Sequence, residues 1–308
     1  MLFDKPLRDH HPIVQLLLLI GLCLSSGGLF ALIAIKSAGS VTGVAGTVLA
    51  DWLQNPDPKY IPYIWWVQSL SAFGVFVLPG IVWAYYYDYD TPWQPLGLHI
   101  RQKPNVWLYV GVLVMVISPI IYWIYGLNQQ IELPEAWSAL EASMKRAEEE
   151  SEKTILLLLS ATGTQAFLIN ILVIAILPAV GEELLFRGVL QNIFRTLFHN
   201  PHLAIWIGAI LFSALHMQWY GFFPRLLLGA MFGYIYFWSG SIFLSIFAHF
   251  INNGAAVAVE MWGGEGGSEA IEKALLNSPW WLLLLSLSAV VVLLKAINVQ
   301  TQNTQTIR

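Results

Sequence analysis

Charged side chains are scarce in this chain of 308 residues. Asp, Glu, Lys and Arg make up 11% of it, against about 25% in an ordinary soluble domain. The formal net charge is −4 and no block of basic residues is present, so we expect no nucleic-acid partner. The single cysteine, Cys23, excludes an internal disulfide.

Hydrophobic residues take the place of the missing charges. They form 57% of the chain, with 14 Trp, 16 Phe and 12 Tyr. This composition predicts an all-α, polytopic membrane helical bundle of about eight transmembrane helices. The protein is then integral to the membrane and multi-pass, in the plasma or inner membrane if its source is bacterial. The predicted spans are residues 13–35, 63–86, 106–125, 165–177, 203–216, 223–238, 242–259 and 280–296.

Residues 133–159 have a different pattern. Apolar side chains such as Trp137, Leu140 and Met144 recur three or four residues apart, while most charges fall on other faces. This pattern predicts an amphipathic helix that lies on the membrane or on the protein surface. Its end, residues 155–159, is wholly apolar and would let the helix dip inward.

These features divide the chain into three parts. Residues 1–160 carry the first spans and the amphipathic helix. Residues 161–262 form a catalytic core, for the reasons that follow. Residues 263–308 comprise a glycine-rich linker, the final span and a polar tail.

Two adjacent carboxylates and an arginine stand beside the hydrocarbon run of residues 168–177. Each ionisable group at membrane depth costs about 2.5–3.5 kcal/mol on insertion scales. Either these groups line a wet cavity or they neutralise one another. Glu183 and Arg187 are four residues apart, so on a helix they share a face and can form an ion pair. Glu182 points about 100° away and can face a cavity.

Pro178 leaves two interpretations of the backbone before these residues. It either kinks the fourth span or occupies the first turn of a new helix, where its missing N–H costs little. In the second case Glu182 and Glu183 lie near the positive end of the helix dipole. The helix would continue to about Phe198.

Further polar residues occur at membrane depth in the next 70 residues. His216 ends the fifth predicted span, one turn beyond Phe212, and His249 and Asn253 lie four apart on the seventh. Each could be a structural group that bonds to a neighbouring helix. Since buried polar groups must find partners, the simplest arrangement is that they meet Glu182.

Two chemistries fit such a cluster. A carboxylate in an apolar cavity can act as a general base with a histidine beside it, while a second histidine and an amide donate to an oxyanion. This describes an amide hydrolase without a covalent nucleophile. Alternatively, two histidines and one glutamate match a catalytic zinc site that keeps water in the fourth position.

Three short motifs follow one another in this part of the chain: Glu182-Glu183-x-x-x-Arg187, Phe212-x-x-x-His216 and His249-x-x-x-Asn253. In this order, each on a predicted membrane helix, they resemble the motifs of the CAAX prenyl endopeptidase/Abi family. These are the type II CAAX-processing enzymes and their bacterial relatives, also called CPBP intramembrane proteases. The resemblance covers about residues 165–260.

The resemblance implies a role for each motif residue. Glu182 would be the water-activating base, assisted by His216, while His249 and Asn253 would stabilise the oxyanion. The supporting residues would be Glu183, Arg187 and Phe212. Glu183 with Arg187 would order the first helix or hold the substrate.

The resemblance also implies a membrane-tethered peptide or protein as substrate, met within the lipid bilayer. We favour a reaction without a metal or other cofactor, because His-Glu-x-x-His, the pattern of many zinc proteases, is absent. Zinc held by Glu182, His216 and His249 is the alternative.

Other functions remain open at this point. Some relatives look like immunity proteins, which would protect by binding, and a polar cluster could also be a proton path in a transporter. Transporters commonly contain two similar halves. Here the polar groups gather in one half, and residues 1–160 contain no second Glu-Glu-x-x-x-Arg, which counts against transport. The Gly-x-Ser-Gly loop of rhomboids and the Gly-x-Gly-Asp of intramembrane aspartyl proteases are also absent.

Overall fold

The computed structural model describes residues 6–44, 57–98, 102–263 and 267–305. Every regular element in these ranges is a helix, so the predicted all-α class is confirmed. Contacts along the chain define two compact units. One comprises Met1–His99 with Glu152–Ala204, and the other comprises Ile100–Ser151 with Ile205–Arg308.

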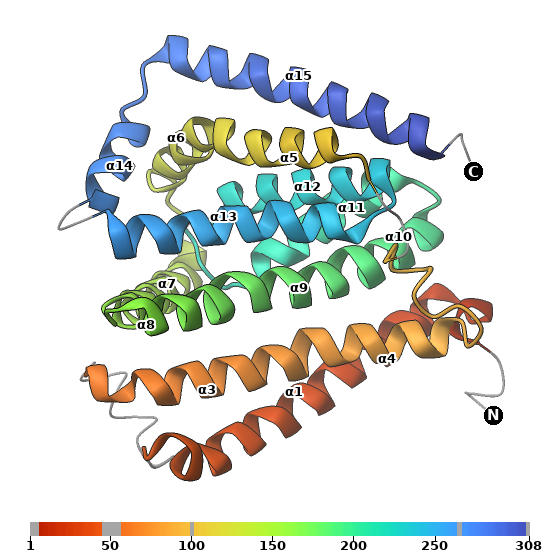
Figure 1. Ribbon diagram of the computed structural model, residues 1–308, viewed down its shortest axis with the longest axis horizontal. Helices are drawn as coiled ribbons and strands as arrows, with labels where there is room; N and C mark the ends of the chain where they lie inside the picture. The colour runs from red at the N-terminus through yellow and green to blue at the C-terminus, as the bar shows by residue number, and fades with distance from the viewer. Residues whose placement is uncertain (1–5, 45–56, 99–101, 264–266, 306–308) are drawn as a thin grey trace. The chain divides into compact units, whose positions relative to one another are not determined.

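Long apolar helices dominate the described part of the first unit. α1 packs against the helix formed by α3, η4 and α4, and that helix also contacts the one formed by α8, η6, α9, η7 and α10 (Figure 1). The bounds are η1 Leu7–Asp9, α1 Pro12–Thr42, η3 Pro58–Tyr60, α3 Ile61–Ala72, η4 Phe73–Val77, α4 Leu78–Tyr87, α8 Thr164–Asn170, η6 Ile171–Ile176, α9 Leu177–Glu183, η7 Leu184–Leu190 and α10 Gln191–Phe198.

A buried amide connects three elements of this unit. The Asn170 side chain in α8 accepts a hydrogen bond from Trp65 Nε1 at 2.7 Å and donates to the carbonyl of Leu158 at 2.8 Å. Asn170 is fully buried, so both bonds replace hydration that it loses. They hold α8 against α3 and against the end of α7.

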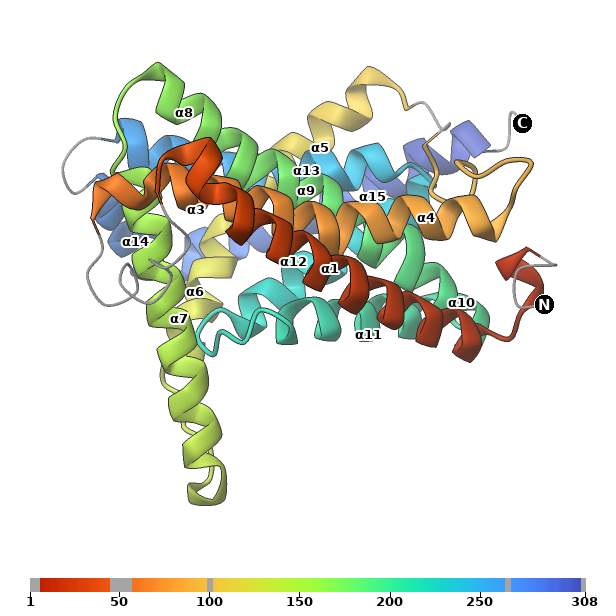
Figure 2. The same cartoon turned by 90° about the horizontal axis from the view of Figure 1, so that it is seen from below.

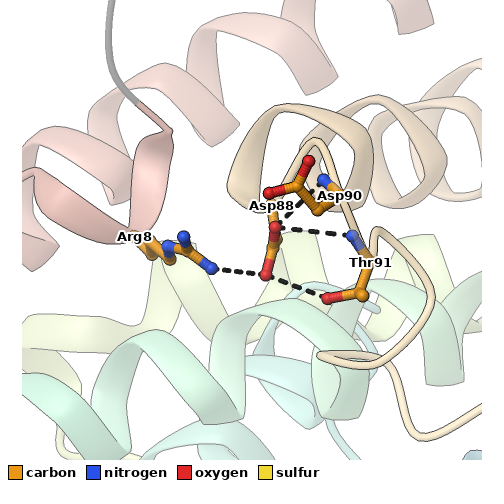
Figure 3. Close-up of polar contacts among 4 residues, drawn as sticks. All are labelled: Arg8, Asp88, Asp90 and Thr91. Atoms are coloured by element: carbon orange, nitrogen blue, oxygen red, sulfur yellow. Dashed lines mark hydrogen bonds and ion pairs between the residues drawn. The ribbon is translucent and has the colours of Figure 1, made fainter.

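The short segment before α1 is tied to the turn after α4. Arg8 forms an ion pair with Asp88, and the Asp88 carboxylate also accepts from the Thr91 hydroxyl at 3.0 Å and the Asp90 backbone N–H at 3.1 Å (Figure 3). An aspartate that bonds the backbone two residues ahead favours a turn. This polar cluster therefore ends α4 and holds η1 beside it.

In two of the long helices a proline comes just after a π-helical segment. Pro79 follows η4 and Pro178 follows η6. A proline lacks the N–H for the normal helical bond and clashes with the carbonyl four residues earlier, and a π-turn relaxes this conflict. The helix is continuous over Thr164–Phe198, so the interpretation of Pro178 as the start of a separate helix is wrong, and the two carboxylates are not in a first turn.

The second unit has its core around α5. A buried cluster joins α5 to α12, α13 and α15 (Figure 1), and it includes Val110, Leu113, Phe232, Ile235 and Leu244. The bounds are α5 Pro104–Val116, α6 Ser118–Asn128, η5 Glu135–Trp137, α7 Ser138–Leu159, α11 Pro201–Ala214, α12 Phe222–Ser239, α13 Ile242–Trp262, α14 Gly267–Leu276 and α15 Trp280–Gln305.

The helix predicted over residues 133–159 is present as η5 and α7. Figure 2 shows α7 as one continuous helix that leads toward α8. It begins in the second unit and ends in the first. Its apolar end behaves as the sequence indicates, because Leu157 and Leu158 are buried in a cluster with Tyr60 and Ile61.

Six helices among the described residues are long and apolar enough to cross a membrane, which makes the protein an integral, multi-pass membrane protein. They correspond to six of the predicted spans. The other two predicted spans are the 14-residue helix α11 and the 18-residue helix α12. Part of the predicted glycine-rich linker, residues 264–266, lies outside the described residues. The predicted division into three parts rests on motifs and stays a prediction.

Candidate functional site

The carboxylate segment, Gly181–Arg187, spans the end of α9 and the start of η7. Glu183 and Arg187 are fully buried, and Arg187 Nη1 lies 3.1 Å from Glu183 Oε1. The ion pair expected from their spacing is therefore present. Glu182 is only partly buried. The two adjacent carboxylates thus differ in their burial.

Glycine at position 181 explains how this segment comes close to its neighbour. A Cβ atom at Gly181 would lie 2.9 Å from Phe76 Cβ and 3.1 Å from Val77 Cγ2. Real Cβ atoms do not approach so closely without displacement of the neighbours. Gly181 therefore allows α9 to pack against η4 one residue before Glu182.

Aromatic contacts hold the two motif histidines in the second unit. The ring of His249 stacks on Phe232 at a centroid distance of 5.2 Å and meets the edge of Phe212 at 5.9 Å. Phe212 also contacts His216 edge-on at 5.1 Å. The histidine group, Phe212, His216, Phe232 and His249, thus comes from α11, the turn after it, α12 and α13, with Phe212 between the two imidazoles.

The hydrogen bond of His216 fixes its tautomer. Its Nδ1 lies 2.7 Å from the backbone carbonyl of Phe212. Because a carbonyl can only accept, Nδ1 must carry the proton and donate. In the neutral imidazole Nε2 is then the acceptor. This nitrogen could accept a proton from water and release it later.

Asn253 lies one helical turn beyond His249 on α13. Its side-chain oxygen accepts a hydrogen bond from Asn252 Nδ2 at 3.1 Å, and the residue is partly buried. Because residues four apart share a helix face, the amide and the imidazole lie on one side of α13. Asn252 was not singled out from the sequence, although its place beside Asn253 was a signal for it.

Two further residues of this region escaped the sequence analysis. Phe232 carries the stacking face for His249, and nothing in its sequence context distinguishes it from a core phenylalanine. A Cβ atom at Gly229 would lie 3.1 Å from Phe212 Cδ1 and 3.4 Å from Ala209 Cα. Glycine at position 229 lets α12 pack closely against α11. It also leaves room for the Phe212 ring that contacts both histidines.

The four predicted catalytic residues belong to two separately described groups. Glu182 lies in the first unit, whereas His216, His249 and Asn253 lie in the second. Their meeting in one site therefore stays a prediction. Within either unit, the described residues include no group of three or more His, Cys, Asp and Glu side chains that could hold a metal ion.

The fold and these two groups define a multi-pass helical membrane protein with adjacent glutamates on α9 and motif histidines on α13 and in the turn after α11. Residues 164–255 match the family described as Type II CAAX prenyl endopeptidase Rce1-like. The resemblance predicted from the three motifs is therefore confirmed over this segment, which contains all seven motif residues.

The chain is also similar to one stretch of a curated protein. Over 86 residues the chain is 34% identical to a protein of Bacillus subtilis (strain 168) that is named Uncharacterized protein YpbD. The matched region makes up 27% of this chain and 41% of the relative, so the chain spans less than half of the relative's length. No solved structure matches the chain.

Proposed function

We propose that this protein is an intramembrane endopeptidase that hydrolyses a peptide bond of a membrane-associated protein or peptide. The observation that carries this proposal is the family match over residues 164–255, a segment with glutamates, histidines and an amide at membrane depth. Such groups are costly in a membrane and mark functional sites. By the same resemblance the substrate is tethered to the membrane near the bond that is cut, as in CAAX processing.

Glu182 is the general base in this proposal, and His216 assists it. The contrast between neighbouring carboxylates supports this assignment, since Glu183 is buried against Arg187 while Glu182 is partly exposed. Glu182 removes a proton from water, and the resulting hydroxide attacks the peptide carbonyl carbon. The proton taken from water passes to Nε2 of His216, which releases it to the leaving amine as the C–N bond breaks.

His249 and Asn253 bind the oxyanion of the tetrahedral intermediate. Their spacing on α13 directs an imidazole and an amide to the same side. The stacked ring of Phe232 restrains His249, and donors held in place before reaction stabilise developing charge most effectively. Phe212 supports both histidines through its edge contacts.

The test uses the purified protein in liposomes that contain a membrane-anchored peptide. Glu182→Gln and His216→Ala should each lower cleavage by about 10²–10⁴-fold, the usual contribution of general acid–base catalysis. Both variants should stay folded in detergent. Cleavage by Glu182→Gln at the wild-type rate would contradict the assignment of the base.

Treatment with a strong chelator separates the metal-free mechanism from the zinc alternative. In the metal-free mechanism cleavage continues after metal removal. The alternative uses Glu182, His216 and His249 as ligands, and a zinc ion would lower the pKa of its bound water to about 7. Complete loss of cleavage that added zinc restores would establish that alternative.

A non-enzymatic role gives different results in the same liposomes. A transporter would carry a proton flux that depends on Glu182 and needs no peptide. An immunity protein that acts by binding would retain a bound peptide without cutting it. Comparison of membrane peptides in cells with wild-type protein and with Glu182→Gln would identify the substrate.

A further inference from the structure

The turn that follows His216 connects α11 to α12. His216 and Met217 extend α11 by single backbone hydrogen bonds, to the carbonyls of Ser213 and Ala214. Met217 has a positive φ of 52°, which is uncommon for a residue other than glycine. His216 therefore lies at a helix end whose direction depends on what holds the rest of the turn.

A carboxylate from the amphipathic helix holds the far end of this turn. In α7, Glu148 Oε2 accepts from the backbone N–H of Tyr220 at 2.7 Å, and Oε1 accepts from that of Gly221 at 3.0 Å. Gly221 directly precedes α12. A carboxylate there satisfies N–H groups that have no partner inside the helix, and it lies at the positive end of the helix dipole. Hydrogen bonds to an ionised group are also the stronger kind.

Other contacts hold the same turn from the end of α6 and the segment after it. Asn128 Nδ2 donates to the carbonyl of Trp219 at 2.6 Å, and Trp219 Nε1 donates to the carbonyl of Ile131 at 3.2 Å. Lys145 of α7 lies over the Tyr220 ring, with Nζ 5.6 Å from its centroid. Glu148 is the one carboxylate in this set that bonds the backbone of the turn.

These contacts are independent of the family motifs. α7 precedes the segment that matches the family, residues 164–255, and Glu148 belongs to none of the three motifs. Two further glutamates, Glu149 and Glu150, follow it directly. The sequence alone therefore does not distinguish Glu148 from glutamates that face solvent. All the contacting residues belong to the second unit.

We propose that Glu148 is a positioning residue for His216, which acts by holding the turn between His216 and α12. This inference rests on the proposed function of His216. With the turn fixed at Tyr220 and Gly221, the His216 ring keeps its hydrogen bond to the Phe212 carbonyl and presents Nε2 to the reaction. Without Glu148 the turn loses the two hydrogen bonds that hold its backbone at Tyr220 and Gly221, and the His216 ring loses its fixed orientation.

The direct test compares Glu148→Ala with Glu149→Ala, a neighbouring exposed glutamate on the same helix. Glu148→Ala should lower kcat by about 10–100-fold, the size of effect that a small misplacement of a catalytic group produces. KM should stay within about threefold, because the proposal assigns the turn to the orientation of His216 and not to substrate binding. Glu149→Ala should match the wild type in both constants.

Glu148→Gln gives a second variant with the same shape. It retains one acceptor oxygen for the two N–H groups, so its kcat should fall between those of the wild type and Glu148→Ala. Both constants are measured on the monodisperse folded fraction. A loss of stability alone lowers the folded fraction and leaves kcat per folded molecule unchanged.

Amide hydrogen exchange tests the contact itself without any substrate. Exchange at residues 215–221 should be faster in both Glu148 variants than in Glu149→Ala. The proposal would be overturned if both Glu148 variants folded and kept the wild-type kcat. It would also be overturned if hydrogen exchange in the turn were unchanged in these variants. Wild-type turnover in His216→Ala would instead overturn the proposed function. The exchange experiment would still test whether Glu148 holds the backbone at Tyr220 and Gly221.

Discussion

The carboxylate segment and the histidine group are held in place by different interactions. Glu183 and Arg187 lie on one helix and pair through opposite charges at 3.1 Å. His249 is held by rings from two other helices, Phe212 at its edge and Phe232 on its face. The first arrangement depends on charge within one helix, and the second depends on the volume of side chains between helices.

This difference determines which changes each region tolerates. Removal of one partner of a buried ion pair leaves a charge without compensation, which is far more costly than loss of an exposed pair. The histidine group is packed by aromatic rings. It should instead respond to small changes in packing that move the rings. The predictions below separate these two kinds of sensitivity.

The largest effect should come from the ion pair of the carboxylate segment. Arg187→Ala leaves the buried Glu183 carboxylate without its cation, so we expect a loss of about 3–5 kcal/mol in the free energy of unfolding. Thermal or denaturant unfolding in detergent measures it. The control is Arg195→Ala on the same continuous helix, an exposed arginine whose removal should cost less than about 0.5 kcal/mol. Equal stability of the two variants would contradict the structural role of the pair.

The next effect should come from the close approach at Gly181. Gly181→Ala introduces a Cβ atom 2.9 Å from Phe76 Cβ, and overpacking of this kind costs about 1–3 kcal/mol. Gly28 of α1 is a matched control, because its Cβ would meet nothing within 4 Å. Gly28→Ala should be neutral or slightly stabilising, as alanine favours helix over glycine by about 1 kcal/mol. The difference between the two unfolding midpoints is the quantity to measure.

A corresponding change in the histidine group should affect turnover more than stability. Gly229→Ala pushes on Phe212 from 3.1 Å, and since Phe212 touches both histidines we expect about a tenfold loss of kcat. Gly208→Ala on α11 is the control, with nothing within 4 Å of the added carbon. If Gly229→Ala retained full turnover, the aromatic contacts would not be what places the rings.

The smallest effect is a dependence of stability on pH in α7. Hydrogen bonds from Lys145 and from the backbone N–H of Leu133 lower the pKa of the Glu141 carboxyl. A carboxyl with a lowered pKa in the folded state stabilises that state above its ordinary pKa of about 4.3, and the contribution is lost as the pH falls through the lowered pKa. The excess of the wild-type unfolding midpoint over that of Glu141→Gln should therefore be larger at pH 7 than at pH 3. A constant difference at both pH values would show that charge is not the cause.

The sequence was sufficient for features that depend on residues near one another in the chain. Helical class, most spans and the Glu183–Arg187 pair follow from hydrophobic runs and from a spacing of four. The π-turns before Pro79 and Pro178 were not predictable, because they depend on how each helix adapts to a proline. Contacts such as Phe232 with His249, or Glu148 with Tyr220, join distant segments, and no local pattern marks them. The role of each motif residue came from the family resemblance alone.

The central claim is that the two neighbouring carboxylates have different roles, and one comparison tests it. Glu182→Gln and Glu183→Gln are assayed side by side for cleavage of a membrane-anchored peptide and for unfolding midpoint. We expect Glu182→Gln to unfold like the wild type and to lose cleavage by at least about 10²-fold. Glu183→Gln should unfold earlier, because Arg187 loses its anion, and should still cut. A stable Glu183→Gln without activity, beside a Glu182→Gln that cuts at the wild-type rate, would contradict the account.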